Sequence, residues 1–175
     1  MCALVELIRV SPKIRLDIRY ATARNFTGRP VYRSSRCFLL QKTAERLHRV
    51  QENLERMGFG LLVYDGYRPH SVQKIFWSLV PDSRFVGDPA IGSPHNRGAA
   101  VDLTLDGCQM PTDFDDFSER ASHSYQGAPL EALKNRDLLK RAMEAEGFVS
   151  LETEWWHYEE PDAKSYPILD VDLPI

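Results

Sequence analysis

The chain has 175 residues and a formal net charge of −3, with 43% hydrophobic and 27% charged residues. These values are typical of a globular domain that is large enough to bury a core without disulfides or a structural metal. The 22 basic residues are outnumbered by 25 acidic ones, which excludes the strongly basic composition of a nucleic-acid-binding domain. The composition therefore predicts one domain spanning residues 1–175, with no nucleic-acid partner.

Three features predict a cytoplasmic protein without a membrane partner. The cysteines, Cys2, Cys37 and Cys108, are odd in number and form no C-x-x-C pair, which favours reduced thiols over disulfides or a zinc knuckle. Charged residues interrupt segment 1–20, unlike the apolar core of a signal peptide. No later segment is apolar for long enough to span a bilayer.

Hydrophobic periodicity predicts a helix and then a strand. Apolar residues recur every three or four positions in segment 40–57, which indicates one helical face, and Gly58 follows as a stop. The run 59–64 (FGLLVY) indicates a buried strand. The Asp65–Gly66 pair after it is typical of a turn.

Segment 71–80 predicts a second, shorter helix with Ser71 as its N-cap. Its inward face is expected to hold Val72, Ile75, Phe76 and Leu79. A loop rich in Pro, Gly and Asp follows over 81–97, and a strand is expected over 99–105.

The last third of the chain predicts a surface excursion, a helix and a pair of strands. Segment 109–129 has no hydrophobic period, whereas 130–146 reads as a helix that stops at Gly147. Segment 148–158 is expected to form the last strands in a hairpin-like arrangement. Because helices and strands are interspersed with irregular crossovers, the pattern favours an α+β fold with a mostly antiparallel sheet flanked by helices.

The segment 93–105 (SPHNRGAAVDLTL) places a histidine before an aspartate. In the predicted strand, aliphatic residues alternate with Asp102, so its carboxylate should point away from the aliphatic face. His95 lies on the preceding loop, where Gly98 helps the chain turn. Imidazole and carboxylate are both zinc ligands, so the two side chains are candidates for a metal pair. The spacing alone is weak evidence for a metal and more often occurs without one.

The segment 154–158 (EWWHY) offers a third ligand and a base. A His/Asp/His set that includes His157 would leave one coordination position open, as catalytic zinc sites do. Glu154 is close enough in sequence to act as a base toward an attacking water. Positions 154 and 157 face opposite sides of a regular strand, so we expect a bend or bulge between them. The alternative is an aromatic core in which His157 is simply hydrogen-bonded.

The segment 65–69 (DGYRP) places an arginine in a turn after the buried strand. Held there, Arg68 could provide a fixed cation where negative charge develops on a carbonyl under attack. The alternative is a surface arginine that pairs with Asp65 and contributes little.

Taken together, the three motifs resemble those of the zinc D-alanyl-D-alanine dipeptidases, a branch of the DD-peptidase and Hedgehog-type metallopeptidases. The similarity runs from IRYATARNFTGRPVY (18–32) through DGYRP, SPHNRGAAVDLTL and FDDFSERASH to EWWHY. It implies a small Hedgehog/DD-peptidase-like α+β domain whose sheet cradles one zinc ion. The implied reaction is hydrolysis of the dipeptide D-alanyl-D-alanine to two D-alanines.

The resemblance also implies a role for each matched residue. The residues similar to the zinc ligands are His95, Asp102 and His157. Glu154 resembles the general base, and Arg68 resembles the residue that polarises the scissile carbonyl. A His/Asp/His set would also accept cobalt or nickel.

Four further residues resemble parts of a substrate pocket. Asp115 is similar to the acid that holds the free ammonium group of the substrate. Tyr20, Asp65 and Ser93 match positions that line the pocket or support Arg68. The expected partner is therefore a small dipeptide. The alternatives are a peptidoglycan DD-carboxypeptidase or LD-endopeptidase with the same zinc chemistry, and a zinc-binding module without catalysis.

Overall fold

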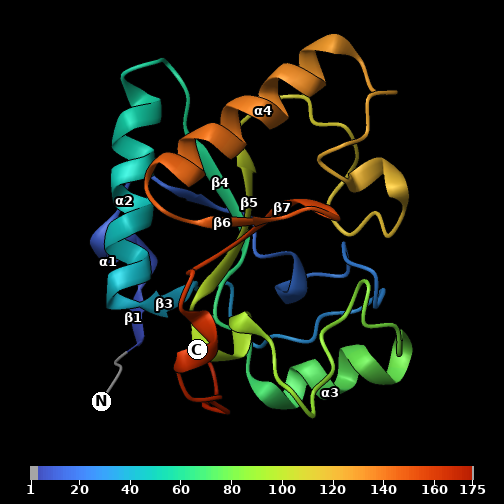
Figure 1. The fold of residues 1–175 in the computed structure, drawn as a ribbon. Helices are drawn as coiled ribbons and strands as arrows, with labels where there is room; N and C mark the ends of the chain where they lie inside the picture. Colours follow the sequence, from blue (N-terminus) through green and yellow to red (C-terminus); the bar gives the residue numbers. More distant parts are fainter. Residues whose placement is uncertain (1–3, 175) are drawn as a thin grey trace.

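A five-stranded sheet and a two-stranded sheet organise the fold in the computed structural model, which describes residues 4–174 (Figure 1). The larger sheet has the strand order β2–β4–β5–β7–β6. Its strands are Arg15–Leu16 (β2), Leu61–Asp65 (β4), Ala100–Leu105 (β5), Val149–Leu151 (β6) and Glu154–Glu159 (β7). The β2–β4 pair is parallel, and the β4–β5, β5–β7 and β6–β7 pairs are antiparallel. The smaller sheet pairs Leu4–Glu6 (β1) with Phe38–Leu40 (β3) in antiparallel orientation.

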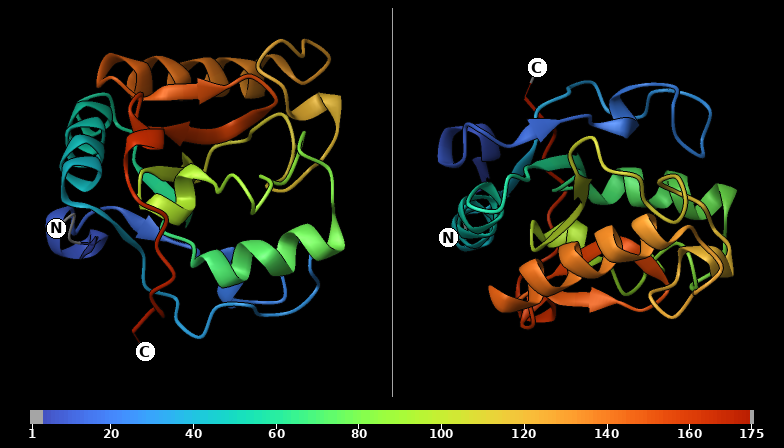
Figure 2. Two further views of the ribbon diagram at one scale, coloured as in Figure 1. Left: turned by 60° about the horizontal axis from the view of Figure 1, so that its bottom comes forward. Right: turned by 90° about the horizontal axis from the view of Figure 1, so that it is seen from above.

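Between residues 4 and 174, four α-helices and four short 3-10 turns accompany the sheets, which confirms the expected α+β class. The helices are Leu7–Val10 (α1), Gln41–Glu55 (α2), His70–Leu79 (α3) and Leu130–Ala145 (α4). The 3-10 turns are Arg19–Ala21 (η1), Pro94–Arg97 (η2), Glu119–Ala121 (η3) and Ala163–Ser165 (η4). Helix α4 lies along β6 and β7 and contacts α2, while α3 lies on the opposite side of the strands from α4 (Figures 1 and 2).

Helix α2 and the central strand β5 form much of the core. The predicted apolar face of α2 is confirmed at Ala44, Leu47, Val50 and Leu54, which have no exposed surface. The prediction is wrong at Met57, which lies beyond the end of the helix and is 59% exposed. The chain leaves this helix through Gly58, whose φ of +82° is costly for any residue with a Cβ. All six residues of β5 are buried, because the strand has packed structure on both faces.

Helix α3 departs from its predicted pattern in two respects. It begins at His70, so Ser71 lies inside its first turn and is not the N-cap, and the Ser71 amide instead donates to Asp170 Oδ1. Leu79, expected to face inward, is 50% exposed at the end of the helix. The buried polar residue on this helix is Gln73, which was not expected to face inward. Its side-chain amide is used in the candidate site, which explains its burial.

Two expectations concern the cysteines and the membrane. Cys37 is a buried free thiol and Cys108 is a partly buried one, while Cys2 lies outside the described residues. Between residues 4 and 174, none of the helices combines the length and the apolar character that crossing a bilayer requires.

Candidate metal centre

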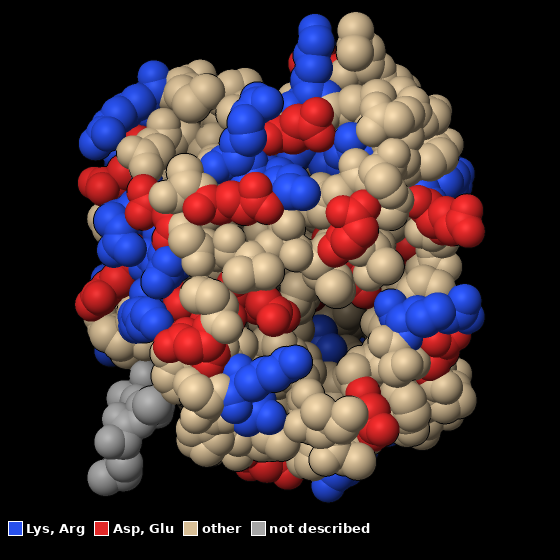
Figure 3. Space-filling view, viewed as in Figure 1, with Lys and Arg blue, Asp and Glu red and all other residues tan. Residues whose placement is uncertain are grey.

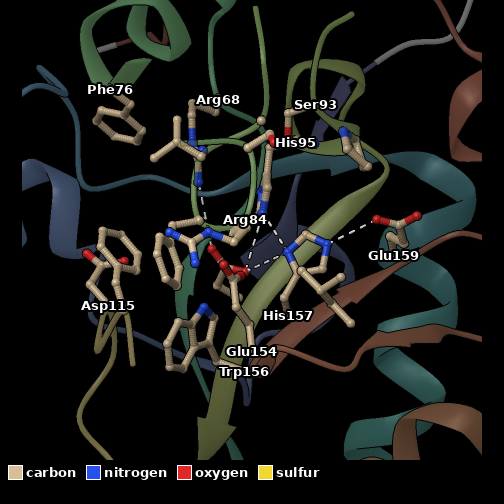
Figure 4. Close-up of a pocket in the computed structure, with 18 of the residues that line it drawn as sticks. Arg68, Phe76, Arg84, Ser93, His95, Asp115, Glu154, Trp156, His157 and Glu159 are labelled. Atoms are coloured by element: carbon tan, nitrogen blue, oxygen red, sulfur yellow. Dashed lines mark hydrogen bonds and ion pairs between the residues drawn. The ribbon is translucent and has the colours of Figure 1, made fainter. Parts of the chain in front are cut away.

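Three candidate ligands come together at the C-terminal side of β7 and the start of β5 (Figure 4). Asp102 on β5 and His157 on β7 are direct neighbours across the antiparallel pair. His95 reaches them from η2. The distances are 3.1 Å from His95 Nε2 to His157 Nδ1, 3.1 Å from His157 Nδ1 to Asp102 Oδ1, and 3.3 Å from His95 Nε2 to Asp102 Oδ1.

Each of the two histidines makes a hydrogen bond away from the ligand group, and this bond determines which ring nitrogen carries the hydrogen. The other nitrogen then directs its lone pair toward the ligand group. His95 Nδ1 lies 2.8 Å from the carbonyl oxygen of Gly66, which can only accept, so Nδ1 carries the hydrogen. His157 Nε2 lies 3.1 Å from Glu159 Oε2 and donates to that carboxylate. Neutral rings in these tautomers leave His95 Nε2 and His157 Nδ1 without hydrogens. Two nitrogen lone pairs and a carboxylate oxygen then converge, which is an arrangement that a cation stabilises.

The spacing of these three atoms fits a small tetrahedral ion. Metal–ligand bonds of about 2.0–2.1 Å in tetrahedral geometry place neighbouring ligand atoms about 3.3–3.4 Å apart. The observed separations are 3.1–3.3 Å. The ligand side chains are all buried, at 3–6% exposure, and each histidine has an outer partner that fixes its ring. The donor set, the spacing and the outer shell therefore all fit zinc.

The loop that carries His95 is held by its own side chains. Ser93 caps η2, since its Oγ accepts from the His95 amide at 3.2 Å. Asn96 accepts from the Ser93 amide at 2.8 Å and donates through Nδ2 to the Arg68 carbonyl at 2.9 Å. Gly98 ends the turn with a φ of +66°, and a Cβ there would lie 2.5 Å from Leu4 Cδ2. The Asn96 side chain thus ties the ligand loop to the arginine turn.

A bulge in the β6–β7 hairpin brings Glu154 to the side of the ligands, as the sequence predicts. Ser150 is opposite Tyr158, but the next residue, Leu151, is opposite Glu154. Three residues of β7 therefore bulge out of register against β6. Glu154 and His157 consequently line the same cavity.

The Glu154 carboxylate is buried and forms no hydrogen bond or ion pair with any residue that the structure describes. Burial raises its pKa to about 8, opposed by His157 and Arg68 and reinforced by the nearby carboxylates of Asp102 and Asp115. A cation bound at the ligand group would lower this pKa by its charge. An unpartnered carboxylate with a raised pKa in a cavity is suited to taking up and returning a proton.

Arg68 is a buried cation fixed by three hydrogen bonds. Its Nε and Nη2 donate to Asp65 Oδ2 at 3.0 and 2.8 Å, and its Nη1 donates to Gln73 Oε1 at 2.9 Å. Burial opposes the charge, but the Asp65 carboxylate acts together with Tyr20, Tyr32 and Asp102 to hold the pKa of Arg68 well above its ordinary value. The other oxygen of Asp65 accepts from Tyr32 Oη at 2.8 Å. Arg68 is therefore not the surface arginine of the alternative interpretation.

Asp115 lies at another wall of the same cavity in a strained conformation. Its φ of +63° is in the left-handed region, which few residues adopt apart from glycine, asparagine and aspartate. Tyr20 Oη donates to Asp115 Oδ1 at 3.0 Å, while Oδ2 is shielded from solvent and has no hydrogen-bond partner among the described residues. Burial raises the pKa of Asp115 to about 7. The unpaired oxygen is placed to accept a hydrogen bond from a bound cation.

The predicted residues, with the exception of Asp65, line one cavity of about 170 Å³. Asp65 has no exposed surface and lies behind Arg68. Figure 3 shows this face of the molecule hollowed between β7 and α3, with a basic side chain visible inside the hollow. The supporting residues that the motifs did not identify are Tyr32, Gln73, Asn96 and Glu159. Glu159 had a signal in the sequence, because it is two positions from His157 and so on the same strand face.

Comparison with known proteins assigns the chain to a family. A family model described as D-ala-D-ala dipeptidase, of the M15 peptidases, matches residues 1–173. The chain belongs to the M15 peptidase family. A D-alanyl-D-alanine dipeptidase of Escherichia coli K12 is 37% identical over 171 residues, covering 95% of this chain and 89% of the relative. Relatives with the same name from Enterococcus faecium and Streptomyces coelicolor are 34% and 37% identical, each covering 93% of both chains.

Membership in the M15 family makes this protein a metallopeptidase, and the His95–Asp102–His157 group could hold the metal that M15 peptidases require. The family match spans nearly the whole chain, so the cavity, the ligand group and the supporting loops all lie within the matched region.

Proposed function

We propose that residues 1–175 form a single zinc dipeptidase domain that hydrolyses D-alanyl-D-alanine to two D-alanines. The observation that carries the proposal is the convergence of His95 Nε2, Asp102 Oδ1 and His157 Nδ1 in a cavity that also exposes Glu154 and Arg68. The printed names of the relatives support this choice of substrate. The donor set favours zinc, although cobalt or nickel would also fit it.

The shape and charge of the cavity support a small substrate with a free amino terminus. A volume of about 170 Å³ is below the range of about 300–1,000 Å³ for sites that bind drug-sized molecules. Asp115 would accept a hydrogen bond from the ammonium group of the dipeptide through Oδ2, which has no hydrogen-bond partner in the described part of the chain. A substrate whose amino terminus is acylated would leave this carboxylate unpaired. Because an unpaired buried charge is costly, the discrimination should be large.

The chain's own residues supply positioning, proton transfer and charge stabilisation. Zinc, when bound by His95, Asp102 and His157, would act as a Lewis acid and make water more acidic. Glu154 takes the proton of the attacking water while the water oxygen bonds to the carbonyl carbon of the substrate. Glu154 then returns that proton to the amide nitrogen, the C–N bond breaks, and D-alanine leaves as the amine.

Arg68 would stabilise the negative charge that develops on the carbonyl oxygen during this attack. Asp65 and Gln73 hold the guanidinium in place before the substrate binds, so the donors need no reorganisation. Tyr20 would orient Asp115 through its hydroxyl, and Ser93 would hold the His95 loop and face the substrate.

We further propose a cytoplasmic location, a free dipeptide as the partner and a Hedgehog/DD-peptidase-like fold. A cytoplasmic location fits the free thiols Cys37 and Cys108, since reduced cysteines are typical of that compartment. A free dipeptide as the partner, without nucleic acid or membrane, fits the net charge of −3 and the small cavity. The antiparallel arrangement of β4, β5, β7 and β6 around the ligand group supports kinship with the Hedgehog/DD-peptidase-like fold.

The test is the release of D-alanine by zinc-loaded protein from D-Ala-D-Ala and from an N-acylated D-Ala-D-Ala peptide. We expect release from the free dipeptide only. Glu154→Gln should reduce kcat by about 100-fold to 10,000-fold while zinc is retained. Release from the acylated peptide would instead assign a DD-carboxypeptidase. Inactivity on both substrates, with zinc bound, would overturn the dipeptidase assignment.

A further inference from the structure

Arg84 is a second cation at the cavity, and no step of the proposed reaction uses it. It lines the cavity together with Arg68, and Figure 4 shows its side chain among the residues around the ligand group. Arg84 is mostly exposed, with 75% of its side chain accessible, whereas Arg68 is buried. The cavity therefore has one cation in its depth and one at its opening.

The charges around the cavity leave one end of a dipeptide without a partner. Four carboxylates line the cavity, namely Asp102, Asp115, Glu154 and Glu159. These acids favour the ammonium group of a zwitterionic substrate but repel its terminal carboxylate. Arg68 is already bound to Asp65 and Gln73 and faces the carbonyl in the proposed reaction. Among the arginine and lysine residues that line the cavity in the described chain, this leaves Arg84.

The loop that carries Arg84 is anchored on both sides of it. Val86 is only 3% exposed and packs in the core. The next residue, Gly87, accepts through its carbonyl from Gln73 Nε2 at 2.8 Å, and the same Gln73 side chain binds Arg68. Phe85 stacks on Phe117 with ring centroids 5.3 Å apart. Arg84 is thus an exposed side chain on a backbone with a defined position relative to Arg68.

The present partner of Arg84 can be shared with a ligand at little cost. Arg84 Nε and Nη2 donate to the Asp82 carboxylate, two residues away on the same loop. Exposed ion pairs of this kind contribute little to stability. The other terminal nitrogen, Nη1, has no partner among the residues between 4 and 174. Its N–H groups remain available to a carboxylate.

From these observations we propose that Arg84 binds the C-terminal carboxylate of the substrate and makes the enzyme selective for peptides with a free C-terminus. The proposal rests on the proposed dipeptidase function. Asp115 and Arg84 would then recognise the two charged ends, while Glu154 and Arg68 act on the bond between them. A substrate with an amidated C-terminus would lose the contact with Arg84 and be bound less well.

The test compares KM and kcat for D-Ala-D-Ala and for D-Ala-D-alaninamide. In Arg84→Ala, we expect KM for D-Ala-D-Ala to rise about tenfold with kcat nearly unchanged. The KM for the amide should not change, so the preference for the free carboxylate is lost. Arg84→Lys should recover part of the affinity. Arg15→Ala is the matched control. Arg15 lies on the edge strand β2, its side chain is also exposed, at 71%, and it also forms an ion pair, with Asp106.

Each outcome separates this proposal from the function on which it rests. If the wild-type enzyme is active and Arg84→Ala has the wild-type KM for both substrates, the role of Arg84 is wrong while the dipeptidase function stands. A fall in kcat at constant KM would also contradict a binding role. If the wild-type enzyme releases D-alanine from neither substrate, the dipeptidase function and the Arg84 proposal are both overturned.

Discussion

The carboxylate of Glu159 accepts a hydrogen bond from His157 Nε2 at 3.1 Å, and this contact leaves the other ring nitrogen, Nδ1, directed at Asp102. With its hydrogen on Nε2, the ring presents the Nδ1 lone pair to the ligand group. Outer partners of this kind orient the ring and increase the basicity of the ligand. Glu159 is therefore expected to act through His157 and not through the substrate.

Removal of this outer partner should weaken metal binding. In Glu159→Ala we expect the zinc affinity to fall by about 10-fold to 100-fold, because the His157 ring is no longer held in one tautomer and orientation. Competition with a chromophoric chelator would measure the affinity directly, without reference to catalysis. Glu159→Gln retains an acceptor oxygen, so its zinc affinity should lie between those of the wild type and Glu159→Ala. Glu131→Ala, an exposed change on α4, is the control and should bind zinc as the wild type does.

The buried ion pair between Asp65 and Arg68 should dominate the stability of the arginine turn. Asp65→Ala leaves a buried guanidinium without its carboxylate, so we expect the free energy of unfolding to fall by about 3–5 kcal/mol. The matched change at an exposed pair, Asp106→Ala opposite Arg15, should cost about 0–1 kcal/mol. Urea denaturation of the metal-free proteins would measure both values. Equal losses in the two variants would contradict the importance of the buried pair.

Much of the fold could be predicted because its long elements carry strong periodicity. Helix α2 keeps a clean apolar face and is followed by Gly58 with positive φ, so its position and its buried face were predictable, although it ends at Glu55, before Met57. Strands β1, β2 and β3 are two or three residues long and contain too few alternations to show a period. Leu79 was wrongly predicted to be buried for a different reason. The last turn of α3 extends beyond the core, so an apolar residue there is exposed even though it follows the helical period.

The reacting groups of the candidate site were easier to predict than their supports. His95, Asp102 and His157 are residue types with few other reasons to be clustered, and the bulge beside Glu154 follows from the face that each strand position occupies. Gln73 acts through Arg68, which lies before it on the adjoining turn, but a glutamine on a helix carries no chemical signature. Only the tertiary structure places that amide against Arg68.

Asp115 predicts a pH dependence for the stability of the metal-free protein. Burial raises its pKa from 3.8 to about 7, so the folded protein binds this proton more tightly than the unfolded chain does. Stability from this group is therefore present at low pH and is lost as the pH rises through about 7. Asp115→Asn removes the charge, keeps an acceptor for Tyr20 and tolerates a φ of +63°.

Relative to the wild type, Asp115→Asn should gain about 2 kcal/mol at about pH 8 and almost nothing at about pH 4. Urea denaturation across this range, with a metal chelator present, would measure the difference. A stability difference that does not vary with pH would show that the ionisation of Asp115 is not responsible. The same variant should bind D-Ala-D-Ala less tightly when loaded with zinc, because the ammonium group loses its counter-charge.

His123 predicts a loss of stability at low pH, whereas Asp115 predicts a loss at high pH. Its ring is buried against Tyr158, with centroids 6.3 Å apart, and neither ring nitrogen has a hydrogen-bond partner among the residues that the structure describes. Burial lowers its pKa from 6.5 to about 4, so the folded state disfavours the proton that the unfolded chain accepts. Stability from this group is thus present above about pH 6.5 and is lost as the pH falls toward 4.

His123→Phe should therefore gain about 2 kcal/mol relative to the wild type as the pH falls from about 7 to about 4. Urea denaturation at several pH values would measure this difference. His48→Gln, at a histidine with 39% of its side chain exposed on α2, is the control for the loss of an imidazole. If the wild type and His123→Phe lose stability in parallel over this range, protonation of another group drives the acid unfolding. If only His123→Phe keeps its free energy of unfolding as the pH falls, the buried His123 imidazole limits the acid stability of the domain.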